Sequence, residues 1–261
     1  MAALFIAVVV LATTGKIFPT HASNHQITLL TISGVVGLVI GDTFFFRGLV
    51  ILGPRLATLV YASWPIMTAT LSWFFLGERL GFMAIAGIIT AFLGIAWVAT
   101  EAKSEWKPKE GDVETGSKAL GIILILLGGL GQAVGLVLAK PAMGDTLAPI
   151  EASLIRMIAA WIVIWAYSIA TGKATRVAAS FKKHKAMLYS LGGAVSGPFL
   201  GIWMSLIAVK HTETGVAAAI MASVPVVIIP VSIIVYRQYP SSRAIIGAFI
   251  TVGGILLLFI R

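Results

Sequence analysis

Long apolar segments recur along the whole chain, and this feature limits the possible folds more than any other. Eight segments each have about the 20 residues that a helix needs to cross the hydrocarbon core of a bilayer. They are residues 27–52, 56–76, 82–100, 119–139, 150–171, 186–209, 214–236 and 244–260. A ninth apolar run, residues 1–13, is too short to cross. Because no period-two alternation is present, a transmembrane barrel is excluded, and the pattern predicts an all-α, polytopic bundle of membrane helices.

The composition supports an integral, multi-pass membrane protein. Of the 261 residues, 59% are apolar and 11% are charged, whereas soluble domains have roughly 45–50% and about 25%. The net charge of +9 comes from basic residues between the apolar segments, where they set membrane topology and do not indicate a nucleic-acid partner. The chain has no cysteine, which excludes disulfides, thiolate metal sites and cysteine nucleophiles.

A charged segment and an internal repeat divide the chain. Residues 101–118 are polar and contain Pro108, so they are interpreted as a linker between a first half, 1–100, and a second half, 119–261. A shift of 160 positions places residues 41–75 over residues 201–235 without a gap, and we call it the repeat shift. The informative matches are Gly41 with Gly201, Ser63 with Ser223, Pro65 with Pro225, Gly87 with Gly247, and Gly94 with Gly254. Repeats of this kind are typical of transporters.

The beginning of the chain matches the middle of a repeat. Residues 1–16 align with residues 158–173, and the second copy continues upstream through a further helix. The first repeat is therefore expected to lack its first helix and part of its second. An internal start codon or a fragment would both explain this pattern.

Three motifs carry a family resemblance. They are GDTFFFRGL at 41–49, ASWPIMTATLSWFFLGERL at 62–80 and IAGIITAFLGIAWV at 85–98. The sequence resembles the drug/metabolite transporter superfamily, specifically its EamA-like branch. The resemblance implies two five-helix repeats of inverted topology that move small metabolites. Residues 237–240 of the second copy depart from the family pattern, which usually has a glycine and a glutamate there, so a symmetric role for Glu78 is not implied.

Ionisable residues inside membrane spans are costly and mark function by default. Asp42 lies near the middle of its segment, and the second copy has Ile202 at that position. Arg156 lies six residues inside its segment and could bind an anionic group of a solute, or form a structural ion pair with Glu151. Arg47 lies nearer a helix end, where a long basic side chain can reach the interface.

Other candidates are residues that break helices or line cavities. Proline within a span frees a backbone carbonyl, and matched broken helices indicate the central site of a transporter. Aromatic side chains can line such a site or simply pack, and the glycine stripe at 193, 197 and 201 is interpreted as a packing surface. The predicted set for substrate binding or coupling is Asp42, Arg47, Tyr61, Trp64, Pro65, Gln132, Arg156, Trp203 and Pro225.

Several site classes are not indicated. His21 and His25 have the spacing of a metal pair but no third ligand near them, so no metal site is predicted. The string GGLGQAVG at 128–135 lies inside a span and is rejected as a dinucleotide loop, and no ATP-binding loop is present. No hydrolase or zinc-protease motif appears, so neither catalytic residues nor a cofactor is predicted.

The sequence thus predicts a permease or exporter of a small organic metabolite. It would work by alternating access, driven by a gradient of the solute or of a coupling proton or cation, in the plasma membrane. A membrane-embedded enzyme and a non-transporting structural membrane protein are the alternatives. The distribution of Lys and Arg places the C-terminus outside the cell, whereas the resemblance implies cytoplasmic termini. The oligomeric state is not indicated.

Overall fold

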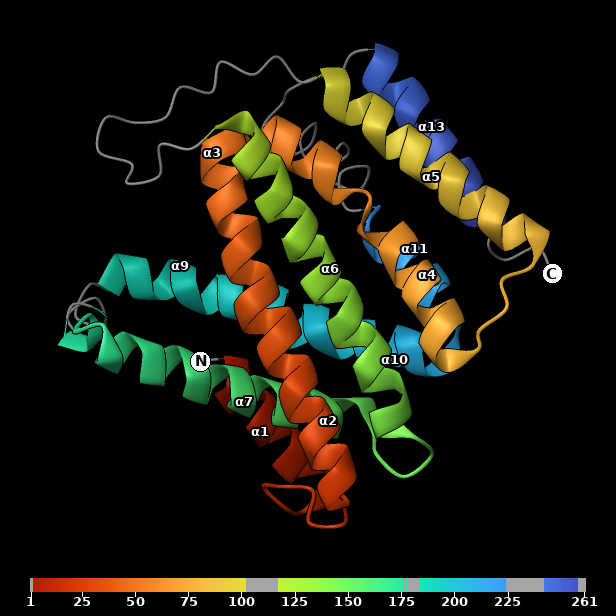
Figure 1. Ribbon diagram of the computed structural model, residues 1–261. Coiled ribbons are helices and arrows are strands. Elements are labelled where there is room, and N and C mark those ends of the chain that lie inside the picture. The colour runs from red at the N-terminus through yellow and green to blue at the C-terminus, as the bar shows by residue number, and fades with distance from the viewer. Residues whose placement is uncertain (1, 102–116, 176, 178–183, 224–241, 258–261) are drawn as a thin grey trace. The chain divides into compact units, whose positions relative to one another are not determined.

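Figure 1 shows the computed structural model of the chain, which describes residues 2–101, 117–175, 177, 184–223 and 242–257. Within these residues all regular secondary structure is helical. The elements are α1 (Ala2–Thr14), α2 (Asn24–Gly34), η1 (Val35–Gly41), α3 (Asp42–Tyr61), α4 (Trp64–Leu76), α5 (Phe82–Glu101), α6 (Lys118–Met143), α7 (Pro149–Ala170), α9 (His184–Ala194), η2 (Val195–Phe199), α10 (Leu200–His211), α11 (Thr214–Met221) and α13 (Ser242–Leu257).

The helices confirm the predicted membrane fold. Five described segments are long and apolar enough to cross a bilayer, and three shorter apolar helices accompany them. The five are Asn24–Gly53, Leu56–Leu76, Lys118–Met143, Pro149–Ala170 and Met187–His211. Each overlaps a span predicted from the sequence. The predicted span 214–236 is described only as far as residue 223, and its remainder lies outside the described residues.

Glycine ends the first long span. Gly53 has φ 75° and ψ 162°, which interrupts the helical path of α3 between two spans. A positive φ of this size is readily adopted by glycine and is strained for other residues. The chain therefore changes direction at Gly53, and the next span begins at Leu56.

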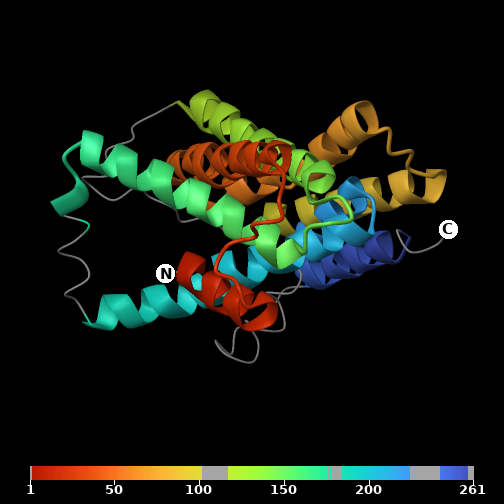
Figure 2. The same cartoon turned by 90° about the horizontal axis from the view of Figure 1, so that it is seen from below.

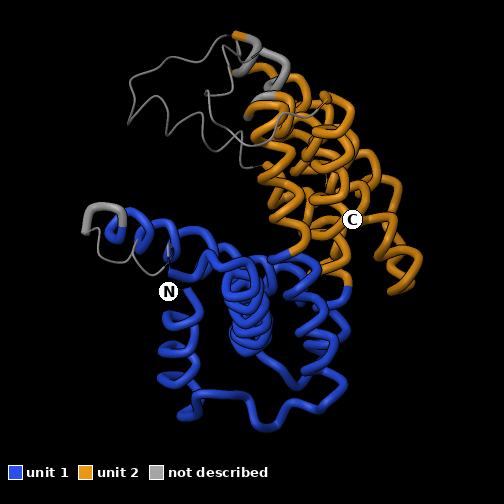
Figure 3. Tube along the Cα trace, turned by 60° about the vertical axis from the view of Figure 1, so that its left-hand side comes forward, with its two compact units in different colours: residues 1–39, 138–211 blue, residues 40–137, 212–261 orange. Residues whose placement is uncertain are grey.

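Two compact units make up the chain (Figure 3). Unit 1 comprises Met1–Val39 and Leu138–His211, and unit 2 comprises Ile40–Val137 and Thr212–Arg261. Each unit combines segments from both halves of the sequence. The division into 1–100, 101–118 and 119–261 stays a prediction from the sequence repeats, and the two compact units are defined by packing instead.

Helix α7 is central to unit 1 and packs against α1, α2 and α10. Its contact with α1 forms a core of Ile6, Val10, Ile150 and Leu154. In contrast, a Cβ added at Gly193 would have no described atom within 4 Å. The close packing predicted for that glycine stripe is therefore not found at Gly193 in the part of the chain that the structure describes.

In unit 2, α5 and α13 lie side by side and pack through glycines (Figures 1 and 2). A Cβ added at Gly94 would lie 2.9 Å from the carbonyl oxygen of Gly247. A Cβ added at Gly254 would lie 2.8 Å from the carbonyl oxygen of Gly87. The repeat shift converts the first contact into the second. Because the later glycine of each helix meets the earlier glycine of the other, these two equivalent helices run antiparallel.

The repeat shift also relates two irregular helical segments. The π-helical segment η1 begins at Val35, and η2 begins at Val195, its equivalent in the second copy. Segments of this type are rare and occur often at functional sites. Pro198 lies inside η2.

Candidate functional site

The second span is broken close to the position predicted from Pro65. Helix α3 ends at Tyr61, Ala62 and Ser63 form a turn, and α4 begins at Trp64. Pro65 lies in the first turn of α4, where a missing N–H removes no helical hydrogen bond. The break therefore precedes the proline, and the proline begins the next helix.

The same turn is present in the second copy. The Ser63 hydroxyl donates to the carbonyl oxygen of Val60 at 2.7 Å. Its repeat equivalent, the Ser223 hydroxyl, donates to the carbonyl oxygen of Ile220 at 2.6 Å. The backbone N–H groups of the two serines donate to the same two carbonyls. Both copies thus end a helix with an identical serine turn, whereas Pro225 lies outside the described residues.

Asp42 lies in unit 2, where η1 meets α3, and is half-buried. Its Oδ1 accepts a hydrogen bond of 2.9 Å from Nε2 of Gln132 on α6. Glycine allows this approach, because a Cβ on Gly128 of α6 would lie 3.0 Å from the carbonyl oxygen of Gly41. Close contact between α3 and α6 therefore brings the carboxylate and the amide together.

Aromatic rings surround this polar pair. The side chain of Gln132 also forms a hydrogen bond with Tyr61, whose hydroxyl lies within electrostatic range of Asp42. The Tyr61 ring centroid lies 4.4 Å from that of Phe45 and 6.2 Å from that of Trp64. We call Asp42, Phe45, Tyr61, Trp64 and Gln132 the Asp42 cluster. Four of its members were predicted from the sequence.

Phe45 is the member that the sequence reasoning missed. It lies three residues after Asp42 in α3, and residues three apart in a helix share one face. This spacing could have identified it. The cluster combines a carboxylate, an amide and a phenol with ring faces, which can attract a cation. A few polar groups among aromatic side chains are typical of sites that bind small molecules.

The structure places Arg156 and Trp203 in unit 1. Arg156 is only 1% exposed, on α7, and the backbone of α2 packs directly against it. A Cβ on Gly34 would lie 2.5 Å from the carbonyl oxygen of Arg156. Trp203 packs against the core between α1 and α7, with its ring centroid 6.0 Å from that of Phe199. Within unit 1 these two residues belong to closely packed surroundings.

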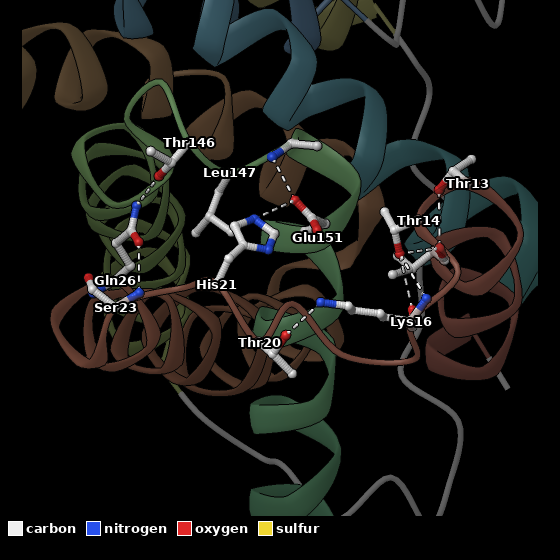
Figure 4. A network of polar contacts seen from close by, with 12 residues as sticks. Thr13, Thr14, Lys16, Thr20, His21, Ser23, Gln26, Thr146, Leu147 and Glu151 are labelled. Atoms are coloured by element: carbon white, nitrogen blue, oxygen red, sulfur yellow. Dashed lines mark hydrogen bonds and ion pairs between the residues drawn. The ribbon is translucent and has the colours of Figure 1, made fainter.

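A second polar network lies at the beginning of α7 (Figure 4). Oε2 of Glu151 accepts a hydrogen bond of 3.0 Å from the backbone N–H of Ala148, and it lies 3.6 Å from Nε2 of His21. Glu151 therefore caps its own helix. Nearby, Nε2 of Gln26 donates to the Thr146 hydroxyl at 2.9 Å. Among the described residues no group of three potential metal ligands is present.

Glu78 connects the two sequence halves within unit 2. Its carboxylate accepts hydrogen bonds of 2.8 Å from both the backbone N–H and the hydroxyl of Thr214, the first residue of α11. A carboxylate at this position satisfies donors of the first helical turn and interacts favourably with the helix dipole. The structure thus gives Glu78 a capping role that its sequence position alone did not reveal.

Comparison with known proteins identifies the family. The model of the EamA-like transporter family matches residues 1–100 and 119–260. The chain belongs to the EamA-like transporter family. A solved structure titled only "Crystal structure of protein" is similar to the EamA-like chain with 19% sequence identity and a TM-score of 0.61, covering 99% of this chain and 94% of the other. This likeness shows a shared fold. No curated protein matches the chain.

Family membership confirms the resemblance predicted from three motifs, and it makes this EamA-like protein an integral, multi-pass membrane protein of a transporter family. The predicted site residues separate into groups. Asp42, Tyr61, Trp64, Pro65 and Gln132 lie at the helix break of unit 2, while Arg156 and Trp203 lie in unit 1. Arg47 is exposed on α3, one helical turn and a half beyond Asp42.

Proposed function

We propose that this EamA-like protein moves a small organic solute across the membrane and that the Asp42 cluster contacts this solute. The observation that supports the proposal best is the half-buried Asp42 carboxylate, which lies well inside the 30-residue span Asn24–Gly53. A charged residue at such a depth costs about 2.5–3.5 kcal/mol on insertion scales. The hydrogen bond from Gln132 offsets part of this cost, and binding a polar solute would use the charge.

The chemistry of the cluster favours a solute that carries a protonated amine. The Asp42 carboxylate would pair with the ammonium group, and the faces of Tyr61, Trp64 and Phe45 would contact the adjacent carbon atoms. A coupling proton or cation would bind the same carboxylate, so that the solute and the ion compete for it. Within unit 1, the guanidinium group of Arg156 would be the candidate that binds an anion. The driving force would be an ion gradient or the gradient of the solute itself.

In this proposal, two inverted repeats produce alternating access. The antiparallel packing of α5 with α13 supports inverted repeats, because these helices are equivalent in sequence and opposite in direction. The matched serine turns at Ser63 and Ser223 support hinge positions, because a helix can change direction most easily where its hydrogen-bond ladder is interrupted. The proposal assigns no catalysis and places the protein in the plasma membrane.

The proposal is tested by finding a solute and measuring its transport. Purified protein is screened by thermal shift against a panel of amines, amino acids and organic anions. Uptake of the radiolabelled form of each stabilising compound is then measured in proteoliposomes, with protein-free liposomes as background. We expect an amine to stabilise the protein and to be taken up. A protein that stays folded but transports no compound that stabilises it would contradict the transport function.

A matched pair of variants tests the site. Tyr61→Phe removes the hydroxyl that interacts with Gln132, and Tyr167→Phe makes the same change on α7, where the side chain is 63% exposed. We expect Tyr61→Phe to raise the KM for uptake several-fold, because about one hydrogen bond is lost. Tyr167→Phe should leave the KM unchanged. If both variants have the same KM as the wild type, Tyr61 does not contact the solute.

A further inference from the structure

Unit 2 contains a pocket of about 490 Å³ between α4, α5 and the loop that joins them. The described lining is almost entirely apolar, with Ile66, Ile85 and Ile89 among its members, and Arg79 is the only charged residue among the described residues that line the pocket. Its volume lies in the range of roughly 300–1,000 Å³ that is usual for sites that bind small molecules. The lining does not include Asp42 or its neighbours, so the pocket is separate from the Asp42 cluster.

The pocket opens on an exposed apolar surface of unit 2. Trp73 of α4 is 60% exposed and Ile85 of α5 is 47% exposed, and both line the pocket. The next two residues of α4, Phe74 and Phe75, are also exposed. Exposed apolar side chains on membrane helices contact hydrocarbon chains, so the occupant of this pocket enters from the bilayer.

Arg79 supplies a positive charge at one end of the pocket. It lies in the loop between α4 and α5, directly beyond the end of the span Leu56–Leu76 and hence at the membrane interface. In the described part of the chain, Arg79 forms no ion pair or hydrogen bond. The neighbouring Glu78 directs both carboxylate oxygens to Thr214. The guanidinium group is thus available to an anion.

We propose that this pocket binds an anionic phospholipid, with one acyl chain between α4 and α5 and the phosphate on Arg79. A guanidinium group can form two parallel hydrogen bonds to a phosphate, and basic pockets between membrane helices suit anionic headgroups. A zwitterionic lipid offers the same acyl chain but adds a positive charge near Arg79. The charge of Arg79 therefore selects the anionic lipid.

The absence of cysteine makes a specific test possible. Thr70, which lines the pocket, is replaced by cysteine and labelled with a bimane fluorophore, the only labelled thiol in the chain. The full-length protein is placed in nanodiscs of phosphatidylcholine that contain a small, equal fraction of doxyl-labelled phosphatidylglycerol or doxyl-labelled phosphatidylcholine. Quenching of the bimane then reports how often each lipid occupies the pocket.

We expect phosphatidylglycerol to occupy the pocket roughly fivefold more than phosphatidylcholine, the preference expected for one basic residue near an anionic lipid. Arg79→Gln should abolish this preference, and Arg79→Lys should restore part of it because the charge returns without the planar fork. Lys16→Gln is the matched control, because Lys16 is also exposed beyond the end of an apolar helix.

Three results would overturn the proposal. Equal quenching by the two lipids in the labelled protein that keeps Arg79 would show that the pocket binds any acyl chain. A preference that persists in Arg79→Gln would assign it to another group. An equal loss of preference in Lys16→Gln would show a general effect of surface charge.

Discussion

Asp42 and Arg156 are both charged residues within apolar spans, but the two compact units surround them differently. In unit 2, Asp42 is half-buried and belongs to a cluster of polar and aromatic side chains. In unit 1, Arg156 is 1% exposed, and the backbone of α2 at Gly34 lies directly against its own backbone. The difference shows that depth in a span does not by itself identify a solute contact. The variants below test whether a solute reaches each charge.

Substitutions at the two sites should affect transport and stability to different degrees. A change at Asp42 removes a half-buried group, so it should alter transport more than stability. A change near Arg156 disturbs closely packed helices, so it should alter stability as well. The following variants test this assignment.

Asp42→Asn should have the largest effect. The substitution keeps the size of the side chain and an oxygen that accepts from Gln132, but removes the negative charge. We expect uptake to fall to the background of protein-free liposomes, while the protein remains folded and inserted. The measurement is uptake in vesicles normalised to inserted protein. Wild-type flux with unchanged pH dependence would show that Asp42 is a tolerated structural charge.

Arg156→Lys should have the second largest effect. Lysine keeps the positive charge but loses the planar fork that suits a carboxylate. We expect solute affinity to fall about tenfold, because a charge-assisted hydrogen bond to the solute is weakened. The free energy of unfolding should change less. Binding is followed by isothermal titration and stability by thermal unfolding in detergent. A large loss of stability with unchanged affinity would assign Arg156 to packing alone.

Gly34→Ala tests the packing at Arg156 directly. The added Cβ would meet the Arg156 carbonyl oxygen at 2.5 Å, so α2 and α7 must separate. We expect a loss of about 1–3 kcal/mol in the free energy of unfolding, as for other overpacked sites. Gly193→Ala is the control, because a Cβ there meets no described atom within 4 Å and alanine favours a helix. Equal unfolding midpoints for the two variants would contradict close packing at Gly34.

Gln132→Leu should have the smallest effect on stability. It removes the donor to Asp42 and keeps a side chain of similar size in α6. The expected loss is about 1 kcal/mol, measured by thermal unfolding. In the Asp42→Asn background the loss should be smaller, since a neutral acceptor forms a weaker hydrogen bond. Identical losses in both backgrounds would show that the charge of Asp42 adds nothing to its hydrogen bond with Gln132.

The membrane spans could be predicted because a span is set by the length of an apolar run, which is a property of consecutive residues. The family was also predicted correctly, from motifs around Asp42 and Pro65. The capping of α11 by Glu78 could not be predicted, since it joins residues far apart in the sequence. The break at Ser63 was located to within two residues, but a serine turn ends the helix there, and Pro65 begins the next helix.

The glycine contact between α5 and α13 has a consequence for the order of synthesis. A ribosome completes Gly87 and Gly94 long before it reaches Gly247 and Gly254, so α5 enters the bilayer while its partner does not yet exist. Until Gly254 has been made, α13 cannot cover the glycine face of α5. Contacts between residues so distant in the chain also close slowly. Among the described helices of unit 2, α13 is therefore made last.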